Sequence, residues 1–183
     1  SFTLRPLLIS SSSIYAYVLS IVSGARIQYI LDHMSTKTKY KVLFLCTGNQ
    51  ARSQMAEALL AARADSMFEV TSAGSAPKSS VHPLAVRALI ERGIDISGAV
   101  PKDVARFTDV PFDYVITLCD NARDVCPVFP GEGDKIHWSI PDPAAAAGTE
   151  DEKLEAFIAA RDDIERRIER FVAEIGSGTS DSD

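Results

Sequence analysis

Cysteine is scarce in this chain, with three residues among 183. Three cysteines cannot pair into a closed disulfide framework, which excludes a small secreted domain held together by disulfides. Basic clusters are missing as well, and the net charge is −6. An acidic chain without a Lys/Arg cluster is poorly suited to a phosphate backbone. We therefore expect a cytoplasmic protein, kept in a reducing compartment, that binds no nucleic acid.

Uninterrupted apolar runs of membrane-spanning length are also missing. The best candidate, residues 7–25, is broken by serines and is a weak transmembrane segment. With Arg5 before an apolar stretch at 14–22 it resembles a signal peptide, and its Ser-rich, acid-poor composition also suits an organellar transit peptide. A third interpretation is upstream-translated or cloning-derived sequence, because Met34 reads as a natural start just before a strand. We expect residues 1–33 to be a non-core segment, and the core domain to have no membrane contact.

The rest of the chain has the composition of one globular domain, since 46% of all residues are hydrophobic and 24% are charged. We expect this domain to span residues 34–175. The polar residues 176–183 are predicted to form a disordered tail.

Strand-like and helix-like segments alternate through the domain. Residues 41–45 and 114–118 are continuous apolar runs of strand length, typical of strands buried on both faces. Shorter strands are predicted at 68–71 and 135–139. Helical spacing of apolar residues predicts helices at 53–64, 82–92, 104–108 and 152–175.

This alternation predicts an α/β fold of three layers, in which a four-stranded parallel sheet carries helices on both faces. In such sheets, ligands bind beyond the carboxyl ends of the strands. A functional site is therefore expected where these strands end.

The first predicted strand ends at Cys46, which leads through a short loop into a helix. The N–H groups of such a loop and the helix N-terminus form a cradle for an anion, and Arg52 can hold a tetrahedral oxyanion with two parallel hydrogen bonds. The same positive surroundings favour the thiolate of Cys46, which is the nucleophilic form. Gly48 is expected to permit the tight turn, and Ser53 to donate to the sulfur. The predicted oxyanion-binding loop consists of Thr47, Gly48, Asn49, Gln50, Ala51 and Arg52.

The stretch from Cys46 to Glu57, Cys-Thr-Gly-Asn-x-x-Arg-Ser-Gln-Met-Ala-Glu, resembles the active-site loop of the low-molecular-weight protein tyrosine phosphatase superfamily. Within that superfamily the chain most resembles the thioredoxin-coupled arsenate reductases. The resemblance implies a four-stranded parallel sheet flanked by helices and reduction of arsenate to arsenite, for arsenic detoxification. It covers residues 39–174, with further motifs in the family's order at 72–74, 94–97, 115–120, 126–127, 137–138 and 142–144.

The other two cysteines, Cys119 and Cys126, flank a polar segment after the third predicted strand. Spacing alone leaves two interpretations: both are small buried hydrophobic residues, or one thiol at the strand end and one on a mobile loop pass a disulfide outward. The resemblance implies the second. Cys46 would attack arsenate, Cys119 would attack Cys46 and release arsenite, and Cys126 would attack Cys119. Some relatives carry a further cysteine where this chain has Ala51.

Such a relay requires an external thiol reductant, and no tightly bound cofactor or metal is expected. The resemblance favours thioredoxin as the reductant. Glutaredoxin or a low-molecular-weight thiol could reduce the same disulfide.

Asp142 stands between two prolines after the last predicted strand. By itself it reads as a turn residue, whereas the resemblance implies a general acid that protonates the leaving oxygen. Phosphotyrosine phosphatases need apolar or aromatic walls for a phenyl ring, but residues 143–148 read Pro-Ala-Ala-Ala-Ala-Gly. The alternative function is a low-molecular-weight phosphatase acting through a Cys46 phosphoenzyme. Weak hydrolysis of small aryl phosphates is expected in either case.

The segment that supports the loop departs from the family. Many thioredoxin-coupled reductases bind a potassium ion with residues that match Asn49 and Glu57, and complete the site with a Thr and an Asp. This chain has Val100 and Lys102 in those places. Because valine offers no side-chain oxygen and an ammonium group repels a cation, we expect Lys102 to supply the positive charge itself by pairing with Glu57. The alternative is a solvated Lys102 and a lost ion site.

Overall fold

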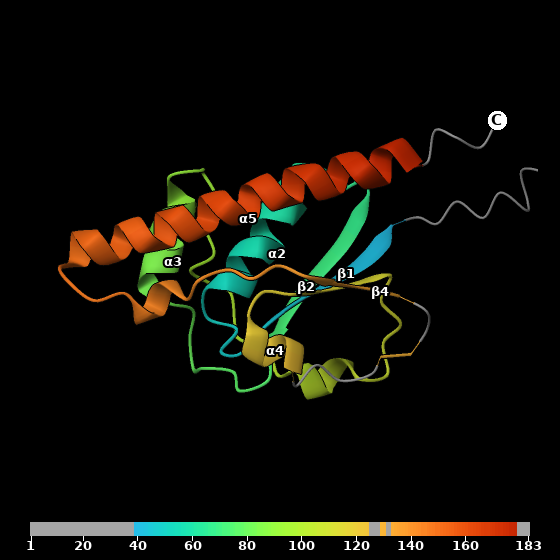
Figure 1. Ribbon diagram of the computed structural model, residues 1–183, viewed down its shortest axis with the longest axis horizontal. Helices are drawn as coiled ribbons and strands as arrows, with labels where there is room; N and C mark the ends of the chain where they lie inside the picture. The colour runs from blue at the N-terminus through green and yellow to red at the C-terminus, as the bar shows by residue number, and fades with distance from the viewer. Residues whose placement is uncertain (1–38, 125–128, 131–132, 179–183) are drawn as a thin grey trace, which may run out of the picture. The chain divides into compact units, whose positions relative to one another are not determined.

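The computed structural model describes residues 39–124, 129–130 and 133–178 (Figure 1). The strands are β1 (Tyr40–Cys46), β2 (Phe68–Gly74), β3 (Tyr114–Thr117) and β4 (Asp134–His137). The α-helices are α2 (Arg52–Ala64), α3 (Pro83–Ile90), α4 (Asp120–Asp124) and α5 (Glu150–Gly178), and short 3-10 helices form η1 (Val104–Phe107) and η2 (Pro143–Ala145). Residues 1–38, which include the expected non-core segment, lie outside the described part.

The strands form one parallel sheet in the order β2-β1-β3-β4. The central strand β1 is paired on both sides, with Cys46 opposite Gly74 of β2 and Leu45 opposite Thr117 of β3. The carboxyl ends of these three strands therefore meet at one edge, where the loop after Cys46 begins. The predicted α/β fold with a four-stranded parallel sheet is confirmed.

Both faces of β1 are buried, which explains its continuous apolar run. Val42 and Phe44 pack into a core shared with α2, α3 and α5, while Leu43 and Leu45 pack into a second core. That second core includes Ala122 of α4 and partly buried residues of η1. Figure 1 shows the longer helices together on one side of the sheet and α4 on the other, so the two outer layers are unequal.

The helix α5 begins two residues earlier and ends three residues later than predicted. Thr149 and Glu152 form a capping box at its start: the Thr149 hydroxyl accepts from the Glu152 N–H at 3.2 Å, and the Glu152 carboxylate accepts from the Thr149 N–H at 2.7 Å. The hydrogen bonds that the Glu152 carboxylate accepts from the backbone N–H and the hydroxyl of Thr149 lower its pKa. The helix takes in residues 176–178 of the expected tail, and residues 179–183 lie outside the described part.

The segment after β3 was expected to be a polar loop, and the structure corrects this to the short helix α4. An acidic residue in the first turn, Asp120, suits a helix N-terminus, and Ala122 is buried against the second core. The sequence signal is weak because the remaining residues of α4 are polar. The helix begins directly after Cys119, so that cysteine lies at the junction of β3 and α4.

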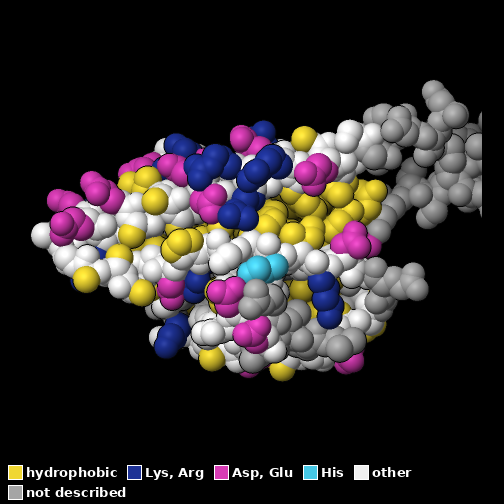
Figure 2. Space-filling model, viewed as in Figure 1, with side chains coloured by type: hydrophobic (Ala, Val, Ile, Leu, Met, Phe, Trp, Pro, Cys, Tyr) yellow, Lys and Arg dark blue, Asp and Glu magenta, His cyan; other side chains and the backbone are white. Residues whose placement is uncertain are grey.

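Charges of both signs are spread over the surface of α5 in Figure 2. Several of them pair, as in the contacts of Arg63 with Glu169 and of Arg92 with Glu165, at 3.1 and 3.0 Å. In the described part of the chain, no helix has both the length and the apolar character needed to cross a bilayer.

Candidate active site

The loop between β1 and α2 is tied by its carbonyl groups to the segment that follows β2. Ala76, Lys78 and His82 donate their backbone N–H groups to the carbonyls of Thr47, Gly48 and Gln50 at 2.8–2.9 Å. These contacts fix the carbonyl side of the loop, and the Asn49 N–H donates to the Cys46 sulfur at 3.2 Å. A loop held in this way is compatible with the anion cradle predicted from the sequence.

The tight turn in this loop is made by Asn49 rather than by Gly48, which corrects the prediction. Asn49 has a φ of 45°, in the left-handed region that asparagine tolerates better than most residues. A glycine is needed instead at Gly74, on the neighbouring strand. A Cβ there would lie 2.5 Å from the carbonyl oxygen of Thr47 and 2.9 Å from the backbone nitrogen of Asn49.

The Cys46 sulfur is buried and has two polar neighbours, the Asn49 N–H and the Ser53 hydroxyl, which lies 2.9 Å away. The direction of the hydroxyl follows from Asn49. Its Oδ1 accepts from the Lys102 N–H at 2.7 Å and from Gln54 Nε2 at 3.1 Å. The Asn49 Nδ2 therefore donates to Ser53 Oγ, leaving the Ser53 proton for the sulfur. Both polar neighbours of the sulfur are therefore hydrogen-bond donors.

The expected support of the loop is also formed. Lys102 Nζ lies 3.0 and 3.3 Å from the two carboxylate oxygens of Glu57. Ser72 Oγ donates to Glu57 and accepts from Asn49 Nδ2 at 2.8 Å. A chain of hydrogen bonds therefore runs from the ammonium group of Lys102 to the loop. Val100, by contrast, is largely exposed.

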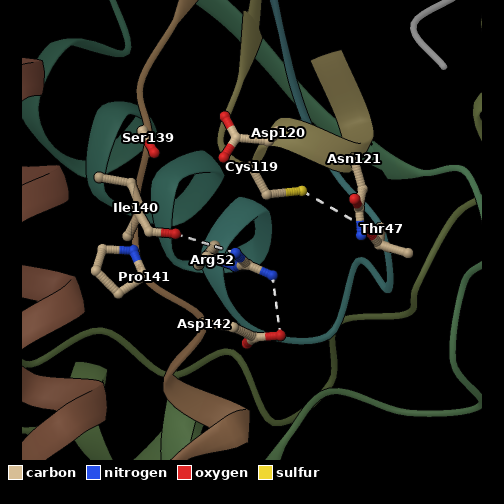
Figure 3. Close-up of a pocket in the computed structure, with 9 residues that line it drawn as sticks. All are labelled: Thr47, Arg52, Cys119, Asp120, Asn121, Ser139, Ile140, Pro141 and Asp142. Carbon is tan, nitrogen blue, oxygen red and sulfur yellow. Dashed lines mark hydrogen bonds and ion pairs between the residues drawn. The ribbon is translucent and has the colours of Figure 1, made fainter. Parts of the chain in front are cut away.

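Arg52 and Asp142 meet across the mouth of the site (Figure 3). The buried guanidinium of Arg52 places Nη2 3.1 Å from Asp142 Oδ2 and donates from Nη1 to the Ile140 carbonyl at 3.1 Å. The other oxygen of Asp142 accepts from the Ala144 N–H at 3.2 Å and caps η2. The ion pair occupies part of the guanidinium that an oxyanion would use, so substrate binding would free the Asp142 carboxyl group.

Two cavities meet at this mouth, and both are lined by Thr47, Arg52 and Asp142. The smaller, of about 160 Å³, also contains Cys46, and the larger, of about 470 Å³, also contains Cys119. None of the described residues that line either cavity is aromatic. This mouth suits a small oxyanion better than a phenyl ring.

Cys119 reaches the same edge of the sheet as Cys46, as the strand pairing predicted. The Leu118 N–H donates to the Leu45 carbonyl at 2.7 Å, which aligns the ends of β3 and β1. The half-buried Cys119 sulfur lies 3.5 Å from the hydroxyl of Thr47, the residue after Cys46 (Figure 3). Cys126 lies outside the described residues.

Three residues of the site were not predicted from the sequence. Gln54 fixes the Asn49 amide, Ser72 joins Glu57 to Asn49, and Lys78 lines the cavity that contains Cys46. Gln54 lies within the stretch that resembles the family's active-site loop, but nothing in that stretch assigns its side chain a role. Lys78 follows Pro77 in a segment without periodicity, and only the return of the chain beside the loop reveals it.

Known proteins resemble this chain along the whole core domain. The sequence model of the low molecular weight phosphotyrosine protein phosphatase family matches residues 41–180. The arsenate reductase of Halalkalibacterium halodurans is 43% identical over 138 residues, which are 75% of this chain and 98% of that relative.

Solved structures agree with this relationship. A structure described as an arsenate reductase in the phosphate binding state has a TM-score of 0.64 at 32% identity, over 74% of this chain and 98% of that one. A thioredoxin-dependent arsenate reductase of Corynebacterium glutamicum has a TM-score of 0.51 at 36% identity, over 75% of this chain and 66% of that one. The chain belongs to the low-molecular-weight phosphotyrosine protein phosphatase family.

Proposed function

We propose that this chain is an arsenate reductase that converts arsenate to arsenite, for arsenic detoxification. One observation carries the proposal: Cys46 and Cys119 lie on two cavities that share Arg52, Asp142 and Thr47. A nucleophile, an oxyanion ligand, an acid and a second thiol thus stand at one mouth. The relatives that bear this name match the chain over nearly their full length.

In the first step, the Cys46 thiolate attacks arsenic and a bond between sulfur and arsenic forms. Arg52 and the loop N–H groups hold the oxyanion, as a preorganised set of donors. The oxygen opposite the sulfur leaves as water, and Asp142 in its acid form supplies a proton to it.

In the second step, the Cys119 thiolate attacks the Cys46 sulfur. A disulfide forms between the two, the bond from sulfur to arsenic breaks, and its electron pair stays on arsenic. Arsenic is thereby reduced from As(V) to As(III) and leaves as arsenite. Cys126 then attacks Cys119, which frees Cys46 and leaves a Cys119–Cys126 disulfide.

That last disulfide is reduced by an external dithiol, for which we propose thioredoxin. The thioredoxin-dependent relative from Corynebacterium glutamicum supports this choice. Glutaredoxin and low-molecular-weight thiols are the alternative reductants. The proposed steps use only thiols, so they require no tightly bound cofactor. Free thiols in such a relay fit a cytoplasmic enzyme.

The alternative, a phosphatase acting through a Cys46 phosphoenzyme, uses the same Cys46, Arg52 and Asp142. The lack of aromatic lining among the described residues of the two cavities makes phosphotyrosine a poor ligand. We propose only weak hydrolysis of small aryl phosphates as a side activity.

The residues behind the loop do not fit a potassium ion, because Lys102 holds the Glu57 carboxylate at 3.0 Å and Val100 has no side-chain oxygen to offer. We propose that Lys102 takes the place of such an ion and holds the loop through Glu57 and Ser72. No step of the reaction then depends on a free cation.

The test of the function is oxidation of NADPH that depends on arsenate, in the presence of thioredoxin and thioredoxin reductase. The proposal requires turnover with arsenate, and glutaredoxin with glutathione serves as the comparison reductant. An absence of turnover with every reductant, together with rapid hydrolysis of phosphotyrosine, would favour the phosphatase instead.

A further inference from the structure

Lys78 is held against the oxyanion loop, although no step of the proposed reaction uses it. Its backbone N–H donates to the Gly48 carbonyl at 2.9 Å. Its stem also lies against this glycine, since a Cβ built on Gly48 would be 3.4 Å from Lys78 Cγ. The side chain lines the cavity of about 160 Å³ that contains Cys46 and is exposed to solvent. Lys78 therefore lies at the cavity that contains the Cys46 sulfur.

The net charge of the groups that line this cavity depends on Lys78. Its other ionisable lining groups are Cys46, Arg52 and Asp142. The charge of Arg52 is already matched by Asp142 at 3.1 Å. Among the described residues, the ammonium group of Lys78 has no ion-pair partner. With Cys46 as a thiolate and Lys78 absent, the lining would be net negative and would repel an oxyanion.

We propose that Lys78 is a specificity-determining residue, whose ammonium group binds the outward-facing oxygen of the substrate. This inference rests on the proposed function. The loop and Arg52 hold the oxygens beside the sulfur, and the remaining oxygen faces the mouth. In arsenate or phosphate that oxygen is a small terminal oxygen or hydroxyl group that can accept a hydrogen bond from an ammonium group, whereas in an aryl ester it carries an organic group. An ammonium group favours the first over the second.

The expected size follows from the exposure of Lys78. A solvent-exposed charge contact is worth up to about 1 kcal/mol, which corresponds to roughly a fivefold change in affinity. Lys78→Gln should therefore weaken the binding of an inorganic oxyanion about three- to fivefold, and Lys78→Arg should keep most of it. The difference should shrink at high ionic strength, because salt screens exposed charges.

The experiment titrates inorganic phosphate into the full-length protein by calorimetry, with Lys78→Gln, Lys78→Arg and the control Lys135→Gln. Lys135 is an exposed lysine on β4 and lines neither cavity. Only Lys78→Gln should raise the Kd for phosphate. A parallel arm measures KM for arsenate and for a small aryl phosphate, and KM should rise more for arsenate.

An unchanged Kd in Lys78→Gln, or an equal change in Lys135→Gln, would overturn the inference. Equal increases in KM for arsenate and for the aryl phosphate would overturn the claim of specificity. An increase only in KM for thioredoxin would assign Lys78 to protein docking instead. If the chain failed to reduce arsenate but lost phosphate affinity with Lys78→Gln, the proposed function would fail while the role of Lys78 in oxyanion binding would stand.

Discussion

The side-chain amide of Asn49 donates to the hydroxyl of Ser53 at 2.8 Å, and this contact decides where the Ser53 proton points. The hydroxyl lies 2.9 Å from the Cys46 sulfur and is left as its donor. The orientation of Asn49 is in turn fixed by two donors on its Oδ1. Asn49 thus orients the Ser53 hydroxyl that lies against the Cys46 sulfur.

Removal of the Ser53 hydroxyl should slow the first step. Hydrogen bonds to charged groups are worth about 1.5–3 kcal/mol, so Ser53→Ala should lower kcat/KM for arsenate roughly tenfold to a hundredfold. Steady-state kinetics with arsenate measure this loss, and an unchanged kcat/KM would contradict a role of the hydroxyl at the Cys46 sulfur.

Replacement of the nucleophile should abolish both activities. Cys46→Ser should remove arsenate reduction and aryl phosphate hydrolysis, because a neutral hydroxyl is a far weaker nucleophile than a thiolate. Arg52→Lys should be nearly as harmful, since a point charge cannot make two parallel hydrogen bonds to an oxyanion. Steady-state assays with both substrates measure this. Turnover of arsenate by Cys46→Ser would refute the assignment of the nucleophile.

The pair between Lys102 and Glu57 should make the enzyme indifferent to potassium. Exchange of sodium for potassium at constant ionic strength should leave turnover of the wild type unchanged, while Lys102→Ala should lose activity clearly. Lys102→Arg, which keeps the charge, serves as the matched control. Strong activation of the wild type by potassium would be incompatible with this role.

The free energy of unfolding should fall at acid pH because of His82. Burial lowers the pKa of His82 from its ordinary value of 6.5, and the negative charge of Asp142 opposes this only in part. The unfolded chain therefore takes up the proton first, so stability is lost as pH falls below about 6.5. The His82 Nδ1 accepts the Leu84 N–H at 3.2 Å and thereby caps α3. A protonated Nδ1 is a donor and could no longer accept this hydrogen bond.

The variant His82→Asn isolates this effect, because asparagine can cap the helix but does not titrate. Urea unfolding at pH 7.5 and 5.5 should show a larger loss of the free energy of unfolding in the wild type than in the variant. The variant should also lose some stability at both pH values, since the ring stacks on Phe157 with centroids 4.5 Å apart. Identical pH dependence in the two proteins would rule out His82 as the cause.

The sequence predicts those parts of the fold and site that depend on local patterns. The apolar run at 41–45, the cysteine after it and the following helix place Cys46 and Arg52 correctly, because strand, loop and helix are consecutive. The pairing of Lys102 with Glu57 was also predicted, but from the resemblance rather than from the residues alone. The left-handed turn at Asn49 was assigned to Gly48, since glycine is the usual residue there.

Other features depend on contacts between distant segments and could not be predicted. Lys78 lies at the site only because its segment runs beside the loop. The ion pair of Arg52 with Asp142 joins residues 90 positions apart, and no local signal marks it. The helix α4 has few apolar residues, and its burial of Ala122 depends on the second core.

In the proposed reaction Cys119 attacks the Cys46 sulfur directly and forms a disulfide with it, and one measurement tests this step. Cys126→Ser is mixed with arsenate without reductant, and its peptides are analysed by mass spectrometry. We predict one arsenite released per chain and a trapped Cys46–Cys119 disulfide. The same variant, before it reacts with arsenate, should still hydrolyse a small aryl phosphate through its free Cys46. The control Cys119→Ser should release no arsenite. Release of arsenite by Cys126→Ser with Cys46 and Cys119 still in separate, unlinked peptides would contradict the account.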